Sequence, residues 1–218
     1  MYRRIDEFIY DNVEDAERER YVYVLFRKLV KSIPSTIYAT HGMYYYPAKF
    51  IPQVVRYVIE KYSKEGDWVF DPFAGYGTVA IECTLTGRNY VVWDLNPMLE
   101  IFVKASTWRD NIEAKELAID WEYPKMFKPL WNNLSYWHPK EFLPVLFRIW
   151  GYYHYGAPSQ IKPVLAIPLL KVTKHFSYAD LQVAKLYKSK RAKERIEKGI
   201  ITEEDLKSAV IEEFVLGT

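Results

Sequence analysis

The feature that most constrains this chain is a glycine-containing loop set between a short apolar run and a helical pattern. Residues 68–70 (WVF) are apolar, the loop follows at 71–78 (DPFAGYGT), and helical spacing over 78–86 ends at 87–89 (GRN). A second apolar run occupies residues 90–93 (YVVW). Short apolar runs bounded by glycine turns are typical of buried strands. The order strand, helix, strand predicts a βαβ unit in an α/β fold, with a parallel sheet that is covered on both faces.

The loop has the composition of a nucleoside-binding turn. Gly75 and Gly77 allow the backbone to turn tightly and approach a ligand, and the amides that open the next helix present donors at its positive end. Asp94 follows the second apolar run, where an acid meets ribose hydroxyls in nucleoside-binding folds. The glycines alone are equally compatible with a tight turn that binds nothing. A phosphate-binding loop is disfavoured, because the Gly-Lys-Ser/Thr ending and the third glycine of the dinucleotide fingerprint are absent.

Three segments resemble methyltransferases that modify the amino groups of adenine or cytosine in DNA. The loop at 71–78 is similar to their Asp-Pro-Phe-x-Gly-Ser-Gly-Thr signature, and residues 94–97 (DLNP) are similar to the acid-x-Asn-Pro after the second strand. Residues 46–52 (YPAKFIP) resemble the segment that closes over the methionine end of the cofactor. The resemblance implies a Rossmann-like fold that binds S-adenosylmethionine on a seven-stranded sheet, not all of which need lie in this chain.

Carried onto matching positions, the resemblance implies contacts with each part of the cofactor. The residues that would line the methionine part are Asp71, Ala74, Gly75 and Gly77, and those that would flank its amino-acid end are Lys49, Phe50 and Pro52. Asp94 would hold the ribose, and Leu95 or Asn96 would lie beside the adenine. Tyr76 departs from the pattern, which has serine or another small residue there. Because of its bulk, we expect its side chain to point to solvent, into the substrate cleft or toward a partner.

The catalytic motif of these enzymes, Asp/Asn/Ser-Pro-Pro-aromatic, has no counterpart here. In the family its first side chain and a backbone carbonyl accept hydrogen bonds from the target amino group, and its aromatic residue stacks on the flipped base. The 218 residues contain no Pro-Pro pair, so no catalytic residue is assigned. We therefore expect the S-adenosylmethionine-binding half of a site-specific DNA methyltransferase. Its partners would be DNA and a second polypeptide that carries the motif, or further copies of the chain.

Two other functions remain open at this point. The chain is compatible with a self-sufficient methyltransferase on RNA or another nucleic acid, with a divergent catalytic element. It is also compatible with a degenerate module that has kept the fold and lost the chemistry. Activity of the purified chain would favour the first of these, and a folded chain without affinity for the cofactor would favour the second.

Beyond about residue 122 the composition changes, which divides the chain into a cofactor-binding region (1–122) and an aromatic, basic region (123–218). Residues 171–198 hold nine Lys or Arg against three acids, interleaved with aromatic residues. Such a stretch suits contact with phosphates and bases, and the predicted nucleic-acid contacts are Lys174, Lys185, Lys188, Lys190 and Arg191. The same stretch is compatible with a solvated helix, because residues 192–198 have the spacing of surface ion pairs.

The remaining features concern the cellular compartment, the histidines and the other predicted helices and loops. The single cysteine allows no disulfide within the chain, and no apolar run approaches the length of a membrane span, so we expect a soluble protein in the reducing cytoplasm. His138, His154 and His175 lack the spacing of a metal site. Residues 4–32 and 52–62 are predicted to be mainly helical, and residues 33–50 to form an extended loop.

Overall fold

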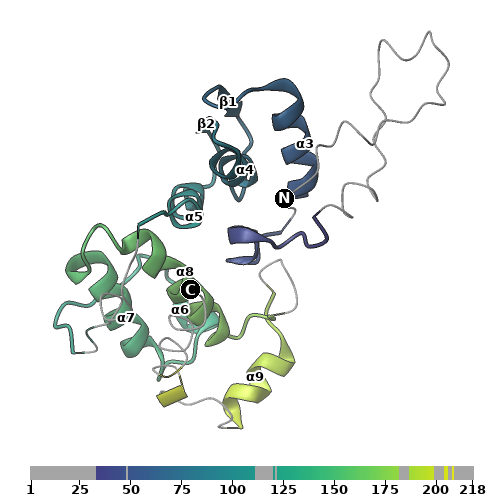
Figure 1. The fold of residues 1–218 in the computed structure, drawn as a ribbon. Coiled ribbons are helices and arrows are strands. Elements are labelled where there is room, and N and C mark those ends of the chain that lie inside the picture. Colours follow the sequence, from purple (N-terminus) through teal and green to yellow (C-terminus); the bar gives the residue numbers. More distant parts are fainter. Residues whose placement is uncertain are drawn as a thin grey trace. The chain divides into compact units, whose positions relative to one another are not determined.

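The computed structural model describes residues 33–47, 49–110, 120, 122–181, 187–198, 204–205 and 208. These residues form two compact units (Figure 1). Unit 1 comprises residues 33–43 and 49–107, and unit 2 comprises residues 44–47 and the described residues from 108 onward. The helix predicted over residues 4–32 lies outside the described residues.

Unit 1 contains the predicted βαβ arrangement. Strand β1 (Trp68–Asp71) pairs in parallel with β2 (Asn89–Val92), with Trp68 opposite Asn89 and Asp71 opposite Val92. Helix α4 (Thr78–Thr86) connects the strands. The prediction of a parallel pair in an α/β fold is therefore confirmed. Among the described residues the sheet has these two strands.

Proline and glycine set the ends of the helices in unit 1. Helix α3 (Pro52–Tyr62) begins at Pro52, where the missing proline N–H costs no intrahelical bond. Helix α4 lies between Gly77 and Gly87, which both adopt left-handed φ angles, of 93° and 72°. Helix α5 (Met98–Ser106) follows β2 and was not predicted.

The three helices cover one face of the sheet. Two small apolar clusters do this: Val55 and Ile59 of α3 pack with Cys83 of α4, and Ala80 of α4 packs with Leu99 and Val103 of α5. Tyr90 of β2 lies against both clusters. Burial raises the pKa of the Cys83 thiol to about 11, so this cysteine behaves as a packed apolar side chain.

The other face of the sheet contradicts the expectation of two covered faces. Exposed and half-buried side chains alternate along both strands, and Trp68 and Phe70 are 71% and 54% exposed. Successive residues of a strand point to opposite faces, so the exposed residues share a single face. The error came from the apolar runs, which are typical of strands buried on both sides but do not show what covers them.

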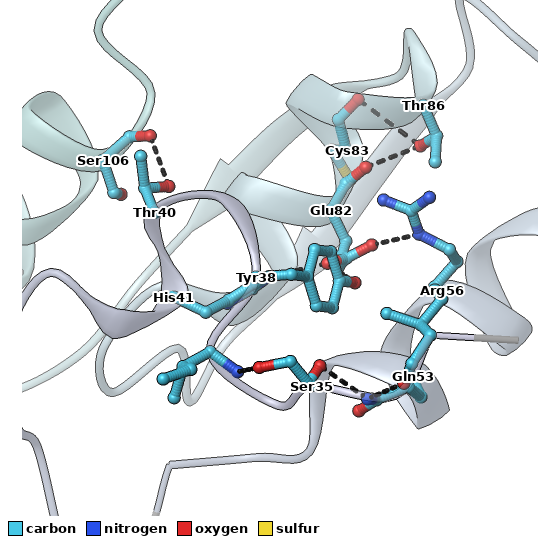
Figure 2. Close-up of polar contacts among 12 residues, drawn as sticks. Ser35, Tyr38, Thr40, His41, Gln53, Arg56, Glu82, Cys83, Thr86 and Ser106 are labelled. Atoms are coloured by element: carbon cyan, nitrogen blue, oxygen red, sulfur yellow. Dashed lines mark hydrogen bonds and ion pairs between the residues drawn. The ribbon is translucent and has the colours of Figure 1, made fainter. Parts of the chain in front are cut away.

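Residues 33–43 were predicted to be part of an extended loop, but they contain the short 3₁₀ helix η2 (Ala39–Gly42) and pack on α3 and α4. The centre of this packing is the buried carboxylate of Glu82, on which Tyr38, His41 and Arg56 converge (Figure 2). His41 Nε2 lies 2.6 Å from Oε1, and Arg56 Nε lies 2.6 Å from Oε2. The Tyr38 hydroxyl donates to Oε1. Three elements distant in sequence thus share one acid.

The charge state of Glu82 follows from these partners. Burial raises its pKa, but hydrogen bonds from His41, Tyr38 and Arg56 outweigh burial, so the pKa lies below its ordinary value. A folded-state pKa that is lowered stabilises the fold at pH values above the unfolded pKa, which is about 4.3 for glutamate. That stabilisation is lost as the pH falls through the lowered value.

Unit 2 is helical and has its own core. Its elements are α6 (Leu134–Trp137), α7 (Leu143–Gly151), the π-helical turn η4 (Tyr152–Gly156), α8 (Lys162–His175) and α9 (Lys190–Glu197). Ile149, Leu165 and Leu169, which are fully buried, lie in the core that α7 and α8 share with Ile196 of α9. In the part of the chain that the structure describes, no helix is long and apolar enough to cross a membrane.

We predict that Glu82→Ala lowers the free energy of unfolding of unit 1 by about 3–5 kcal/mol, because it removes the buried carboxylate that Arg56, His41 and Tyr38 share. Hydrogen exchange of the α3 and α4 amides in increasing urea measures this. The control is Glu100→Ala, which removes an exposed acid paired with Lys104 and should leave the exchange of these helices unchanged. Equal effects of the two substitutions would contradict the assignment.

Candidate cofactor-binding site

The loop between β1 and α4 is built by hydrogen bonds at the carboxyl ends of the two strands. Asp71 Oδ1 accepts from the backbone N–H of Phe73 at 3.0 Å, and the N–H of Ala74 donates to the carbonyl of Trp93 at 2.9 Å. Gly75 and Gly77 have φ angles of 55° and 93°, which an L side chain rarely adopts. The loop therefore runs across the ends of both strands before α4 begins.

Asp94 joins this loop to the one that follows β2. Its Oδ2 accepts from the N–H of Gly75 and its Oδ1 from the N–H of Asn96, both at 2.8 Å. Bonds from the Asn96 and then the Gly75 amides hold the pKa of Asp94 below its usual range. A carboxylate offers about four acceptor positions, so Asp94 remains charged and can accept further hydrogen bonds. This acid and the glycine loop, predicted separately from sequence, form one cluster.

An apolar groove of about 510 Å³ lies beside the loop within unit 1. Five of the predicted cofactor residues line it: Lys49, Phe50, Asp71, Ala74 and Gly75. The volume is within the range of small-molecule sites, about 300–1,000 Å³. Gly75 connects the two parts of the site, because it lines the groove and donates to Asp94.

The other predicted cofactor residues do not line this groove. Pro52 and Gly77 are buried at the first residue and the N-cap of their helices, so they shape the backbone rather than present side chains. Leu95 is fully exposed beyond the end of β2. Asn96 Oδ1 accepts from the N–H of Met98 at 3.0 Å, at the start of α5. Asp94 and Leu95 therefore lie on the β2 side of the loop.

Tyr76 contradicts the expectation that its side chain would face solvent, a substrate cleft or a partner. The residue is 2% exposed, its ring packs against Phe102 at 5.3 Å between centroids, and its hydroxyl donates to the carbonyl of Thr40 at 3.0 Å. The Tyr76 side chain, which is larger than the usual serine, packs inside unit 1. There it connects residues 38–43 to the glycine loop.

Lys49 is the polar residue at the other wall of the groove. Its ammonium lies 4.1 Å from the centroid of the Tyr76 ring and donates to the carbonyl of His41. Burial lowers the pKa of Lys49. The lysine predicted to flank the amino-acid end is thus held in place by the residue that departs from the family pattern.

The sequence reasoning missed the residues that hold the groove wall. Neither Glu82 nor His41 was considered, although both are completely buried. A buried acid in the middle of an apolar helix is a usable signal, because charged side chains are rarely buried unless paired. The identity of its partners carries no such signal, since they lie 26 to 44 residues away.

In unit 2 the structure places four of the five predicted nucleic-acid contacts, and Lys185 lies outside the described residues. Lys190 and Arg191 are exposed in the first turn of α9. Lys188 instead donates to the carbonyl of Tyr136 at 2.8 Å and lies over the Tyr136 and Tyr178 rings. Lys174 is half-buried near the end of α8.

The histidines of unit 2 occupy packing and surface positions. His138 is buried and lies 3.3 Å, through Nδ1, from the carbonyl of Phe176, whereas His154 stacks on Phe127 at the surface. His175 is exposed at the end of α8. Within the described ranges, no three acids, histidines or cysteines lie close enough to hold a metal ion.

Comparison with known protein families identifies the segment that contains this site. Residues 9–104 match the N6/N4 methyltransferase family, described as DNA methylase. Over these residues the chain is similar to DNA methyltransferases that modify amino groups. Enzymes of this family use S-adenosylmethionine as the methyl donor. The matched segment includes the glycine loop, Asp94 and all the helices of unit 1 up to most of α5.

Several curated Type II methyltransferases are similar to the chain. M.MjaII of Methanocaldococcus jannaschii is 32% identical over 81 residues, which are 37% of this chain and 15% of that enzyme. M.MvaI of Kocuria varians is 27% identical over 188 residues, which are 77% of this chain and 41% of that enzyme. M.XycI of Xanthomonas campestris pv. cyanopsidis is 44% identical over 48 residues, 22% of this chain and 16% of that enzyme.

The chain thus spans less than half the length of each of these relatives. No solved structure matches it significantly.

We predict that Gly77→Ala destabilises unit 1 by about 2–4 kcal/mol, as left-handed backbone strain and overpacking add. The new Cβ would lie 2.5 Å from Val103 Cγ2. Urea unfolding measures the loss. Gly66→Ala is the control, because Gly66 also has a positive φ, 86°, but nothing lies within 4 Å of its Cβ position. A Gly77 variant no less stable than the Gly66 variant would contradict the close contact.

Proposed function

We propose that this chain is the S-adenosylmethionine-binding part of a DNA methyltransferase that modifies the exocyclic amino group of adenine or cytosine. We propose further that a second polypeptide contributes the Asp/Asn/Ser-Pro-Pro-aromatic motif. The observation that carries the proposal is the Asp94–Gly75 hydrogen bond, at 2.8 Å. It brings the acid expected at the ribose and the glycine loop expected at the methionine into one cluster.

The residues of the cluster fit the cofactor by their chemistry. Asp94 is charged, exposed and has acceptor capacity left for two ribose hydroxyls. Leu95 offers an exposed apolar side chain beside it for the adenine. Asp71 and Gly75 line the groove, where a carboxylate suits the amino group of methionine and a glycine permits close approach of the chain.

Methyl transfer from a sulfonium to an exocyclic nitrogen is a direct displacement, and S-adenosylmethionine supplies the methyl group. The contribution of this chain is positioning: Asp94 fixes the nucleoside end, and the groove walls at Lys49 and Phe50 confine the amino-acid end. The target base must leave the duplex to reach the methyl group. Acceptors for its amino protons come from the Pro-Pro motif, which lies outside these residues.

The basic surface of unit 2 is proposed to contact DNA. Lys190 and Arg191 are exposed at α9, and Tyr187, which precedes them, is 60% exposed. Exposed cations and an exposed aromatic ring suit contact with phosphates and bases. We propose that Lys174 and Lys185 contribute to the same surface and that Lys188 acts mainly in packing. As a DNA-modifying protein, the chain is expected to act in the cytoplasm of its cell.

The first experiment is a calorimetric titration of the purified chain with S-adenosylmethionine. We predict one site, and we predict that Asp94→Ala weakens binding about ten- to a hundredfold, since hydrogen bonds to a charged acceptor are removed. Asp94→Asn should retain an intermediate affinity, which separates loss of charge from collapse of the loop. Asp67→Ala is the control, because Asp67 is an exposed acid of unit 1 outside the site. Unchanged affinity in Asp94→Ala would contradict the assignment.

We predict that the double variant Lys190→Ala/Arg191→Ala weakens binding to duplex DNA. The slope of log K against the logarithm of the salt concentration should become less steep by about 2, because each phosphate that is no longer neutralised contributes near 0.9. Fluorescence anisotropy at several salt concentrations measures both. Lys104→Ala, at an exposed lysine of α5, should change neither. A salt dependence that stays at the wild-type value would remove α9 from the DNA-binding surface.

A further inference from the structure

A cavity of about 470 Å³ lies within unit 2 and is lined by residues 127–134 and by the helices α7 and α8. Its walls are mainly leucine and aromatic side chains, among them Trp150 and the stacked rings of Phe127 and His154. None of the described residues that line it is an acid, a lysine or an arginine. The volume is within the range of sites that enclose a small molecule, about 300–1,000 Å³. This lining suits an uncharged aromatic compound.

His138 contributes a hydrogen-bond acceptor to the cavity. The residue is 8% exposed, and its Nδ1 lies 3.3 Å from the carbonyl oxygen of Phe176. Because a carbonyl only accepts hydrogen bonds, Nδ1 carries the proton, and Nε2 of the neutral ring is left as an acceptor. Burial lowers the pKa of His138, which favours this neutral ring. Within the described part of the chain, no hydrogen bond is made to Nε2.

The cavity is the route by which a ligand reaches Nε2. Completely buried side-chain nitrogens and oxygens without a partner occur, among the described residues, in His41, Gln53 and Arg195. His138 Nε2 is not one of these atoms, so it is accessible although most of its side chain is buried. Since His138 lines the cavity, we infer that Nε2 opens into it.

The other polar groups of the cavity already have partners or lie near water. The indole N–H of Trp150 donates to Thr173 Oγ1 at 2.9 Å, and the Thr173 hydroxyl donates to the carbonyl of Leu169 at 2.6 Å. His154 is exposed, so water reaches its ring nitrogens. A matching ligand therefore needs one N–H or O–H donor for His138 and an apolar ring elsewhere.

The balance of polar and apolar lining selects between two classes of aromatic ligand. Unit 2 carries the surface proposed to contact DNA, so an unpaired nucleobase is one alternative. Adenine and cytosine, however, carry several acceptors, and each one buried against leucine without a partner is costly. Indole and phenol carry one N–H or O–H donor on a ring that is otherwise apolar. The cavity matches the second class.

We propose that this cavity is a binding site for an uncharged small aromatic molecule with one N–H or O–H donor, an indole or a phenol, and that His138 Nε2 accepts its hydrogen bond. The site belongs to unit 2, and the proposal does not depend on the cofactor site proposed in unit 1.

The test is a calorimetric titration of the full chain with indole and with benzofuran, which has the same ring shape but an oxygen in place of the N–H. We expect indole to bind at one site. Benzofuran should bind at least about tenfold more weakly, because it leaves the buried acceptor unpaired. His138→Phe should bind the two compounds equally, since the variant keeps a ring but has no acceptor.

A second variant tests the cavity without changing His138. Leu170→Trp places a larger side chain at a lining position of α8 and should abolish the binding of indole. Leu181→Trp is the matched control, because Leu181 is an exposed residue that does not line the cavity, and it should bind indole normally.

Four results would each overturn the inference. They are equal affinity of the wild type for indole and benzofuran, no binding of indole, indole binding that survives Leu170→Trp, and cytidine binding that is tighter than indole binding and lost in Leu170→Trp. Tighter binding of N-acetyltryptophanamide than of indole would also overturn it, in favour of a tryptophan side chain from a polypeptide.

Discussion

The carboxylate of Glu82 is the interaction on which the arrangement of unit 1 depends. It receives Tyr38 and His41 from residues 33–43 and Arg56 from α3, while its own backbone belongs to α4. Without it, the buried His41 and Arg56 and the half-buried Tyr38 would lose the acceptor that they share, which is the costly way to break a buried network. Because residues 38–43 also receive the Tyr76 hydroxyl and the Lys49 ammonium, the same acid indirectly fixes the groove wall.

The candidate site has two parts, the hydrogen bonds around Asp94 and the groove beside the glycine loop. The clamp between Asp94 and the amides of Gly75 and Asn96 is local to the ends of two paired strands, and it is complete within this unit. The groove, in contrast, is bounded on one side by Phe70, an exposed residue of β1. In the proposed function, the clamp at Asp94 would preorganise the nucleoside end of the methyl donor.

Much of unit 1 follows from local sequence. The bounds of α3 and α4 and the parallel strand pair were predicted from Pro52, the apolar spacing and the glycine turns, because each depends on backbone preferences over a few residues. The resemblance assigned both Asp94 and the glycine loop to the cofactor, and the structure brings them together at the carboxyl ends of the paired strands. The exposure of Trp68 and Phe70 on one face of the sheet was not predicted, and the prediction for the Tyr76 side chain was wrong. In both cases the sequence shows which residue is apolar or bulky, but it does not show which elements surround that residue.

What the sequence alone determined is the resemblance of its glycine loop, the βαβ unit and the residues that meet at its carboxyl end, because glycine conformation and strand periodicity act over short distances. Only the tertiary structure decided that Glu82 joins three elements, that Tyr76 and Lys49 build a groove wall, and that Trp68 and Phe70 on one sheet face are exposed. These features depend on pairs of residues separated by 26 or more positions, and on which surfaces receive a neighbour. Free energies of burial and pairing arise from those contacts, and local patterns do not encode them.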